Sequence, residues 1–159
     1  MSRPMSLPLV AKPVVVRYPS TTNGGFTTGV VTLKNALKAW IVVSLQQAAG
    51  HATVITPRQS TTIALGATAV IPAVPIWANE DVGASDTLVA QAAAANYTVN
   101  NDVKKKLVIF EIDPAILTDG YPCIYATVGD SSQATNFANV EIWLWQTNQV
   151  ATPPSAILD

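Results

Sequence analysis

The chain has 159 residues, of which 49% are hydrophobic and only 12% are charged. Its 9 basic and 10 acidic residues give a net charge of −1, which excludes the broad positive field that binds nucleic acid through its phosphates. A single cysteine excludes an internal disulfide framework and a cysteine metal cluster. Globular domains ordinarily carry about 25% charged residues, so we expect part of this surface to be covered by other protein.

The start of the chain lacks the pattern of a targeting signal. Prolines and Lys12 interrupt any apolar run of signal-peptide length near the N-terminus. Residues 59–79 carry no charge and have the length of a membrane span, but Pro72 and Pro75 favour strands and turns there. We therefore expect an extended N-terminal arm over residues 1–12 and no membrane partner.

Segments rich in Val, Ile, Thr and aromatic residues have the composition of β-strands, and turn-forming residues separate them. Short strands at this spacing predict an all-β fold, an antiparallel β-sandwich, and their number favours a jelly-roll-like arrangement. We expect one sandwich domain over residues 13–148. The predicted strands are residues 13–17, 26–34, 37–46, 52–56, 60–65, 68–77, 106–112, 123–128 and 139–145.

Two segments depart from the strand pattern. Asp113 can cap a helical start, Pro114 suits the first helical position and Gly120 can end the turn, so we expect one short helical turn there. Residues 85–98 are ambiguous, because their alanines favour a helix locally while the all-β surroundings favour an extended chain. We favour the extended chain.

Residues 149–159 are predicted to form an extended C-terminal tail. Pro153 and Pro154 favour a polyproline-like course. The apolar residues Ile157 and Leu158 near its end are better explained if the tail docks on another surface. A disordered terminus is the alternative interpretation.

Residues that could carry out chemistry are few. His51 is the only histidine, and no GxSxG turn or comparable nucleophile accompanies it. The acidic stretch 79–86 offers oxygen ligands that could hold calcium, but it lacks the pattern of an EF-hand loop, so a solvated turn is favoured. Glu111 and Asp113 lack the supporting residues of a glycosidase pair. We expect no enzymatic activity, no cofactor and no metal site.

Tryptophans occupy strand faces that alternation would leave to water. In residues 139–145 every second side chain is aliphatic, so Trp143 and Trp145 fall on the opposite face. Trp40 lies on the corresponding face of residues 37–46. Three explanations are open: arms or loops of the same chain cover the rings, another protein contacts them, as tryptophan does in interface hot spots, or they stack on sugars.

A run of three lysines, residues 104–106, leads into the predicted strand 106–112. Its simplest interpretation is a solvated strand start, where lysines also deter edge-to-edge pairing. The alternative is that these lysines pair with an acidic surface of a partner. The candidate protein-interface residues are therefore Trp40, Trp143, Trp145, Lys104, Lys105, Ile157 and Leu158.

Segments between residue 37 and the C-terminus resemble a group of small tailed-phage virion proteins that are encoded beside the major capsid protein. The most specific segments are the FEIDP turn, the GDSSQATNFANV loop before the last strand, and the PPSAILD ending. The resemblance implies a jelly-roll-like cement (decoration) protein, which binds the outer surface of the capsid lattice as a homodimer or homotrimer. It implies no set of functional residues, because such proteins act through their surfaces.

We therefore expect a non-enzymatic protein of the virion, located on the capsid exterior after assembly in the host cytoplasm. Its expected partners are the major capsid protein and further copies of itself. The Trp-bearing faces would make subunit contacts, and an arm would reach onto neighbouring capsid subunits. Two other functions fit the same residues: a carbohydrate-binding β-sandwich module, and a head–tail joining or tail structural protein.

Overall fold

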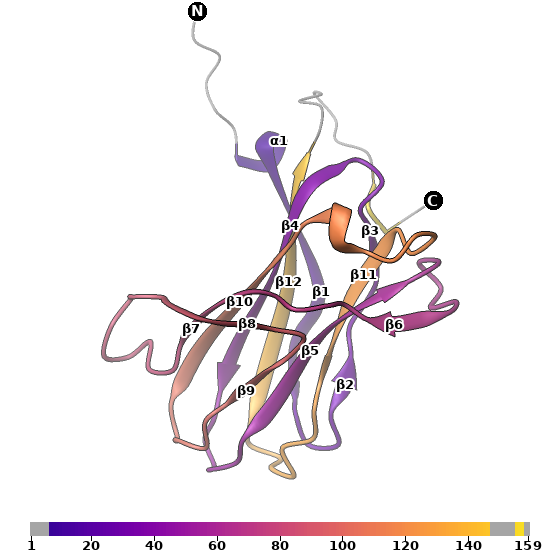
Figure 1. The fold of residues 1–159 in the computed structure, drawn as a ribbon. Helices are drawn as coiled ribbons and strands as arrows, with labels where there is room; N and C mark the ends of the chain where they lie inside the picture. Colours follow the sequence, from indigo (N-terminus) through magenta and orange to yellow (C-terminus); the bar gives the residue numbers. More distant parts are fainter. Residues whose placement is uncertain (1–6, 147–154, 158–159) are drawn as a thin grey trace, which may run out of the picture.

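The structure, a computed structural model, describes residues 7–146 and 155–157 and is almost entirely β (Figure 1). In chain order its elements are α1 (Leu7–Val10), β1 (Ala11–Thr21), β2 (Phe26–Thr27), β3 (Val31–Thr32), β4 (Ala36–Gln46), β5 (Thr53–Ser60), β6 (Thr68–Val70), β7 (Val74–Asn79), β8 (Val89–Ala94), β9 (Tyr97–Val99), β10 (Lys105–Ile112), the 3₁₀ turn η1 (Pro114–Ile116), β11 (Cys123–Val128) and β12 (Phe137–Gln146).

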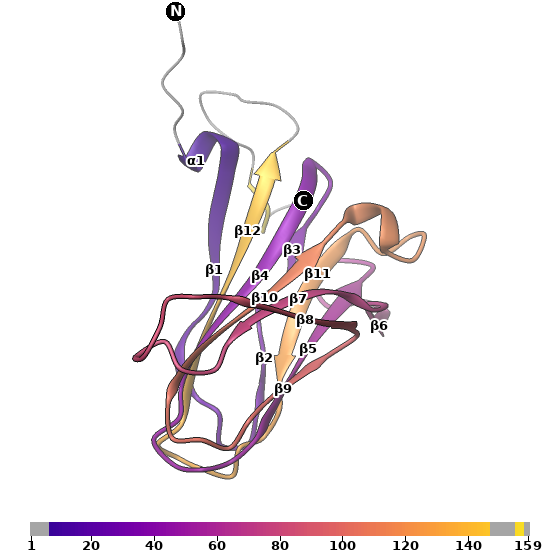
Figure 2. The ribbon, with the colours of Figure 1, turned by 60° about the vertical axis from the view of Figure 1, so that its left-hand side comes forward.

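Two antiparallel sheets pack face to face as a sandwich (Figure 2). The first sheet has the strand order β1-β12-β4-β10-β7-β8, and the second has the order β2-β11-β5-β6, with β3 also paired to β11 and β9 to β5. Along the chain, single strands or pairs of consecutive strands alternate between the sheets, as in a jelly roll: β1, β4, β7 with β8, β10 and β12 belong to the first sheet, and β2 with β3, β5 with β6, β9 and β11 to the second. β7 and β8 extend one edge of the first sheet. The predicted fold class is confirmed.

The core lies between the two sheets and is built by strand alternation. Along β10, for example, Val108, Phe110 and Ile112 point inward and are fully buried, while the residues between them face outward. Each such side chain contributes about 1.5–3 kcal/mol relative to an exposed position. The outward side chains of the strands are therefore not needed to form the core and can contact other molecules.

The predicted strand 68–77 is in fact two strands that belong to different sheets. β6 ends at Val70 and β7 begins at Val74, with Pro72 between them. Proline cannot donate a ladder hydrogen bond, so the chain leaves the second sheet there and enters the first. The predicted strand 26–34 is likewise divided into β2 and β3.

The predicted strands 52–56 and 60–65 differ from the structure in another way, because a single strand, β5, runs from Thr53 to Ser60, and residues 61–65 of the second predicted strand belong to no strand. β5 runs through Pro57, whose carbonyl accepts a hydrogen bond from the backbone N–H of Ile71 at 3.3 Å. On that side of β5, Pro57 lies between the segments paired with β9 and β6. The missing N–H therefore falls in a gap of the ladder, where no strand requires it.

The ends of the domain differ in part from the prediction. Residues 7–10 of the expected extended arm form the helical turn α1, to whose first turn Pro8 is suited. β1 begins at Ala11, two residues before the predicted start. The rest of the arm and most of the tail lie outside the described residues.

The short helical turn expected after the FEIDP segment is present as η1. The Asp113 carboxylate accepts a hydrogen bond from the backbone N–H of Ala115 at 2.9 Å and caps the turn. η1 ends at Ile116, well before Gly120. The segment 85–98 is extended and forms β8 and β9. Across the described ranges, no helix has both the length and the apolar character needed to cross a membrane.

Candidate protein-interaction surface

The outer side of the first sheet carries the tryptophans that the sequence placed opposite the core. In β12 the inward residues are buried, and Glu141, Trp143 and Trp145 alternate with them on the outward side. Trp40 projects from β4 in the same direction, because it is directly paired with Trp143 across the two strands. The two rings therefore lie side by side on one surface.

Neighbouring strands extend this surface in two rows. In the first row Glu111 of β10 is paired with Trp40 on the side away from Trp143. The second row runs through Glu141, Val42, Ile109 and Trp77 across β12, β4, β10 and β7. We call this surface, which also includes Lys38 and Trp145, the aromatic face.

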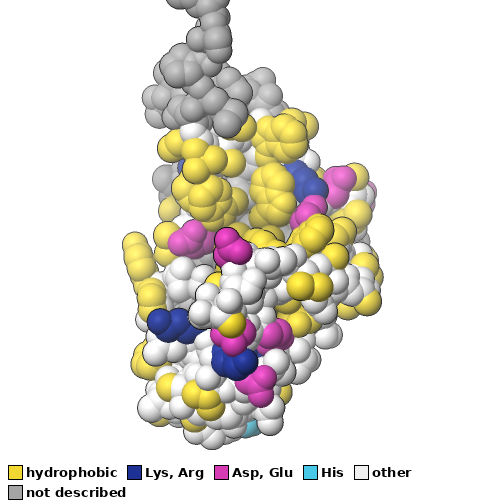
Figure 3. Space-filling view, turned by 90° about the vertical axis from the view of Figure 1, so that its left-hand side faces the viewer, with side chains coloured by type: hydrophobic (Ala, Val, Ile, Leu, Met, Phe, Trp, Pro, Cys, Tyr) yellow, Lys and Arg dark blue, Asp and Glu magenta, His cyan; other side chains and the backbone are white. Residues whose placement is uncertain are grey.

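The aromatic face contains an apolar hollow of ≈ 360 Å³. Figure 3 shows hydrophobic side chains gathered around a depression, with acidic and basic side chains at its border. Trp40 and Trp143 are half-buried in this surface, whereas Trp77 and Trp145 are 38% and 45% exposed. The residues that line the hollow are Ala11, Trp40, Val42, Ile109, Glu141 and Trp143.

Polar contacts hold the aromatic rings in place. Trp143 Nε1 donates to Glu141 Oε2 at 3.0 Å, and Trp77 Nε1 donates to Glu111 Oε1 at 2.8 Å. The hydrogen bond from Lys38, helped by that from Trp77, holds the pKa of Glu111 below its ordinary value against the effect of partial burial. The indole N–H groups of Trp77 and Trp143 are thus satisfied, and their ring faces remain available for contact.

Sequence reasoning found Trp40, Trp143 and Trp145 but did not place Trp77 on this surface. The signal was present, because Val74 and Ile76 are buried and alternation then puts Trp77 on the outer side. The predicted strand 68–77 obscured it by joining two strands that lie in different sheets. Within the described part of the chain, no loop fully covers the aromatic face, although Ala11 borders the hollow.

The lysine run lies at the other end of the first sheet and has contacts within the chain. Lys104 Nζ lies 2.7 Å from Asp81 Oδ2, and this hydrogen bond lowers the pKa of Asp81 and raises that of Lys104. Lys105 is exposed at the start of β10. The structure does not bring Lys104 and Lys105 together with the tryptophans. The two lysines lie just before and at the start of β10, whereas Trp40 is paired with Glu111 near the end of that strand.

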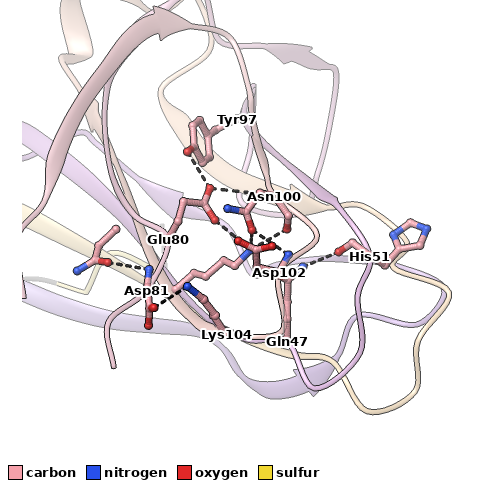
Figure 4. A network of polar contacts seen from close by, with 10 residues as sticks. Gln47, His51, Glu80, Asp81, Tyr97, Asn100, Asp102 and Lys104 are labelled. Carbon is pink, nitrogen blue, oxygen red and sulfur yellow. Dashed lines mark hydrogen bonds and ion pairs between the residues drawn. The ribbon is translucent and has the colours of Figure 1, made fainter. Parts of the chain in front are cut away.

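Lys106 is 1% exposed and contacts a polar network that includes Glu80, Tyr97 and Asn100, which Figure 4 labels. Its ammonium lies 3.0 Å from Glu80 Oε2 and donates to the backbone oxygen of Asn100 at 2.7 Å and to the Asn100 side chain. Tyr97 Oη donates to Glu80 Oε1 at 2.8 Å, and burial together with this carboxylate raises the pKa of Tyr97. The network joins the β7–β8 loop to the segment before β10.

This network explains the acidic stretch that the sequence offered as a possible calcium site. The Lys106 ammonium already provides the positive charge beside Glu80, and Lys104 provides it beside Asp81. No group of three or more His, Cys, Asp or Glu side chains that could hold a metal is found among residues 7–146 and 155–157. The His51 ring contacts the carbonyl of Ala52 at 2.7 Å in its loop.

The described part of the tail docks on the sandwich. Ala156 is buried, and its carbonyl accepts a hydrogen bond from the backbone N–H of Thr32 at 2.8 Å. The neighbouring Ile157 is 53% exposed, and Leu158 lies outside the described residues. The tail therefore contributes to the core through Ala156, while Ile157 remains accessible.

No family model and no curated protein matches this chain. Among solved structures, the SPBc2 prophage-derived protein YomS is similar, with a TM-score of 0.49 and 7% identity over 84% of this chain and 91% of that one. A putative sugar binding protein from Bacteroides thetaiotaomicron VPI-5482 has a TM-score of 0.30 and 9% identity over 77% of this chain and 66% of that one. What this chain does is best judged from its own surfaces.

Proposed function

We propose that this protein is a non-enzymatic structural protein of a tailed-phage virion, and that it binds the outer surface of the capsid as a cement protein through its aromatic face. The observation that carries the proposal is the pair Trp40 and Trp143, which border an apolar hollow on an otherwise charge-poor chain. Exposed apolar patches of this kind mark protein-interaction sites. The sequence resemblance to virion proteins supplies the identity of the partner.

The contact chemistry fits binding to a rigid protein lattice. The rings of Trp77 and Trp143 are held by hydrogen bonds to carboxylates, so little side-chain freedom is lost when a partner covers them. Tryptophan is enriched among residues that dominate binding energy. Lys38 and Glu111 would form part of the polar border that orients the partner.

Binding to purified capsids tests the proposal. Shells of a tailed-phage major capsid protein, the partner that the sequence resemblance implies, would be mixed with wild-type protein and with the double variant Trp40→Ala/Trp143→Ala, and co-sedimentation would be measured. We expect at least a 10-fold loss of affinity, since removal of two hot-spot residues commonly costs more than about 2 kcal/mol.

A matched control is Tyr18→Ala, because Tyr18 is an aromatic residue of β1 that is 76% exposed and does not line the hollow. It should bind as the wild type does. Equal binding by the Trp40/Trp143 double variant and the wild type would contradict the proposal, provided that both are folded by circular dichroism.

A carbohydrate-binding module is the second candidate, and one observation favours it. The hollow combines two indole rings with the carboxylate of Glu141, and sugar sites use such a combination of stacking and hydrogen bonding. Titration with polysaccharides, followed by tryptophan fluorescence, distinguishes the two. A saturable spectral shift that Trp143→Ala abolishes, without capsid binding by the wild type, would favour the carbohydrate function.

A further inference from the structure

Strand β8 forms the outer edge of the first sheet, beyond β7 (Figure 2). Its sequence is VAQAAA, and residues 87–101 around it contain no charged side chain. Four of its six residues are exposed, among them Val89 at 56%. An exposed edge of this kind presents unpaired backbone donors and acceptors to which another strand can add.

The other sheet edges among the described strands are protected against such addition. β1, the opposite edge of the first sheet, contains Pro13, Pro19 and Arg17, and its register is shifted twice along β12. In the second sheet, the edge strands β2, β3, β6 and β9 have only two or three residues each. Prolines, charges, bulges and short length are the usual devices that prevent edge pairing. Of these devices β8 has only one register shift against β7, between Val74 and Ile76; it contains no proline and no charge, and it has six residues.

β8 is also weakly specified as a strand. Alanine favours helix over strand, and the strand ladder of β8 joins it to β7 alone. The Gln91 side chain donates to the backbone oxygen of Val89 at 3.1 Å, a contact that a neighbouring strand could replace. A second ladder would therefore add hydrogen bonds where the strand is least supported.

We propose that β8 pairs antiparallel with β8 of a second copy of this chain, which joins two copies of the first sheet into one continuous sheet. A two-fold axis pairs each residue with itself or with a residue an even number of positions away, because directly opposed side chains share a face. A charged residue on the two-fold axis would therefore face its own copy, and β8 carries no charged residue. Its alanines also let the two strands approach without steric conflict.

The geometry of this dimer would favour capsid binding, and this part of the inference rests on the proposed function. The two-fold axis of an antiparallel strand pair stands perpendicular to the sheet, so the outer sides of both copies face the same way. Both aromatic faces would then be directed at the same surface. A dimer of this form could bind a repeating lattice at two points, and the second contact would gain from the high effective concentration.

Light scattering across a range of concentrations tests the pairing. A single short ladder is a small interface, so we expect the mass of the wild type to rise with concentration from 16.7 kDa toward twice that value. The variant Ala90→Lys/Ala92→Lys places like charges across the pair and should remain a monomer. Ala90→Glu/Ala92→Glu should do the same, and an equal mixture of the two variants should recover the dimer.

A matched control makes the same change at a protected edge. Thr68→Lys/Val70→Lys adds two lysines to exposed positions of β6, and it should associate as the wild type does. The pairing is overturned if the wild type stays at 16.7 kDa up to about 1 mM. It is equally overturned if either charged β8 variant associates like the wild type, since another surface would then be responsible.

A failure of the β8 pairing can be distinguished from a failure of the capsid-binding proposal. The variant Trp40→Ala/Trp143→Ala should lose capsid binding but keep the concentration-dependent mass of the wild type. A monomeric wild type that still binds capsids would overturn the β8 pairing alone. A dimer that dissociates in the β8 variants but never binds capsids would overturn only the capsid-binding proposal.

Discussion

The two ends of the first sheet use the same chemistry for different purposes. At one end Lys38 and Glu111 form an ion pair whose side chains are 35% and 23% exposed, beside the tryptophans. At the other end Lys106, with a side chain that is 0% exposed, pairs with Glu80 beneath a loop. The buried pair cannot be separated without leaving a charge in a low-dielectric site, whereas the other pair can exchange its partners with water. One end therefore secures the fold, and the other is free to bind.

The largest expected effect is that of Lys106→Met. Removing the buried Lys106 leaves Glu80 without its cation, and because the Glu80 side chain is 26% exposed we expect a loss of about 3 kcal/mol in the free energy of unfolding, the lower end of the range for buried pairs. Urea denaturation measures this loss. Lys105→Met is the matched control, because the neighbouring lysine is exposed, and it should change stability by less than about 0.5 kcal/mol.

Replacing both residues of the buried pair sharpens the same test. The double variant Glu80→Gln/Lys106→Met removes both charges, so its cost should be smaller than the sum of the two single costs. An additive result would mean that Lys106 acts through packing and through Asn100, without a contribution from its charge pair with Glu80.

The next largest effect belongs to the aromatic face. Trp40→Ala and Trp143→Ala remove half-buried rings, so we expect each to cost about 1–2 kcal/mol of stability, less than a fully buried ring would. The two rings are paired across the sheet, so the double variant should deviate from additivity. A cost of 4 kcal/mol or more for either, estimated on the scale of core aromatics, would identify that ring as part of the core.

A smaller effect concerns pH. The pKa of Glu111 is lowered in the folded protein, mainly by Lys38, so the folded state holds its charged form more tightly than the unfolded state does. This contribution to stability is complete above the ordinary pKa of 4.5 and is lost as the pH falls through the lower folded value. NMR titration of the Glu111 carboxyl should show the lowered pKa in the wild type and a higher one in Lys38→Met.

The smallest effect is that of Lys38→Met on stability at neutral pH. Partly exposed ion pairs contribute about 0.2–1 kcal/mol, and added salt screens part of that. Denaturation at low and high salt should show a small loss that shrinks with ionic strength. Lys34→Met, at an exposed lysine before β4, serves as the control for the loss of one positive charge. If Lys38→Met lowered the free energy of unfolding as much as Lys106→Met does, and independently of salt, the Lys38–Glu111 pair would be as important for the fold as the contacts of Lys106.

The sequence by itself determined the fold class and the face on which most side chains lie. Alternation in β12 separated its core residues from Trp143 and Trp145, and it did so because successive side chains in a strand point to opposite sides. The cap of η1 by Asp113 was also predictable, since a carboxylate one residue before a proline satisfies a free backbone N–H locally.

Only the tertiary structure decided which residues became neighbours. Glu111, Lys38 and Trp77 come from three strands that are distant in sequence, and their contact depends on the register between β4, β10 and β7. Periodicity fixes the face of a side chain but carries no information about cross-strand pairing, which depends on long-range packing. For the same reason the sequence could not show that Lys106 is buried against Glu80, or that β8 lies at an edge of the first sheet.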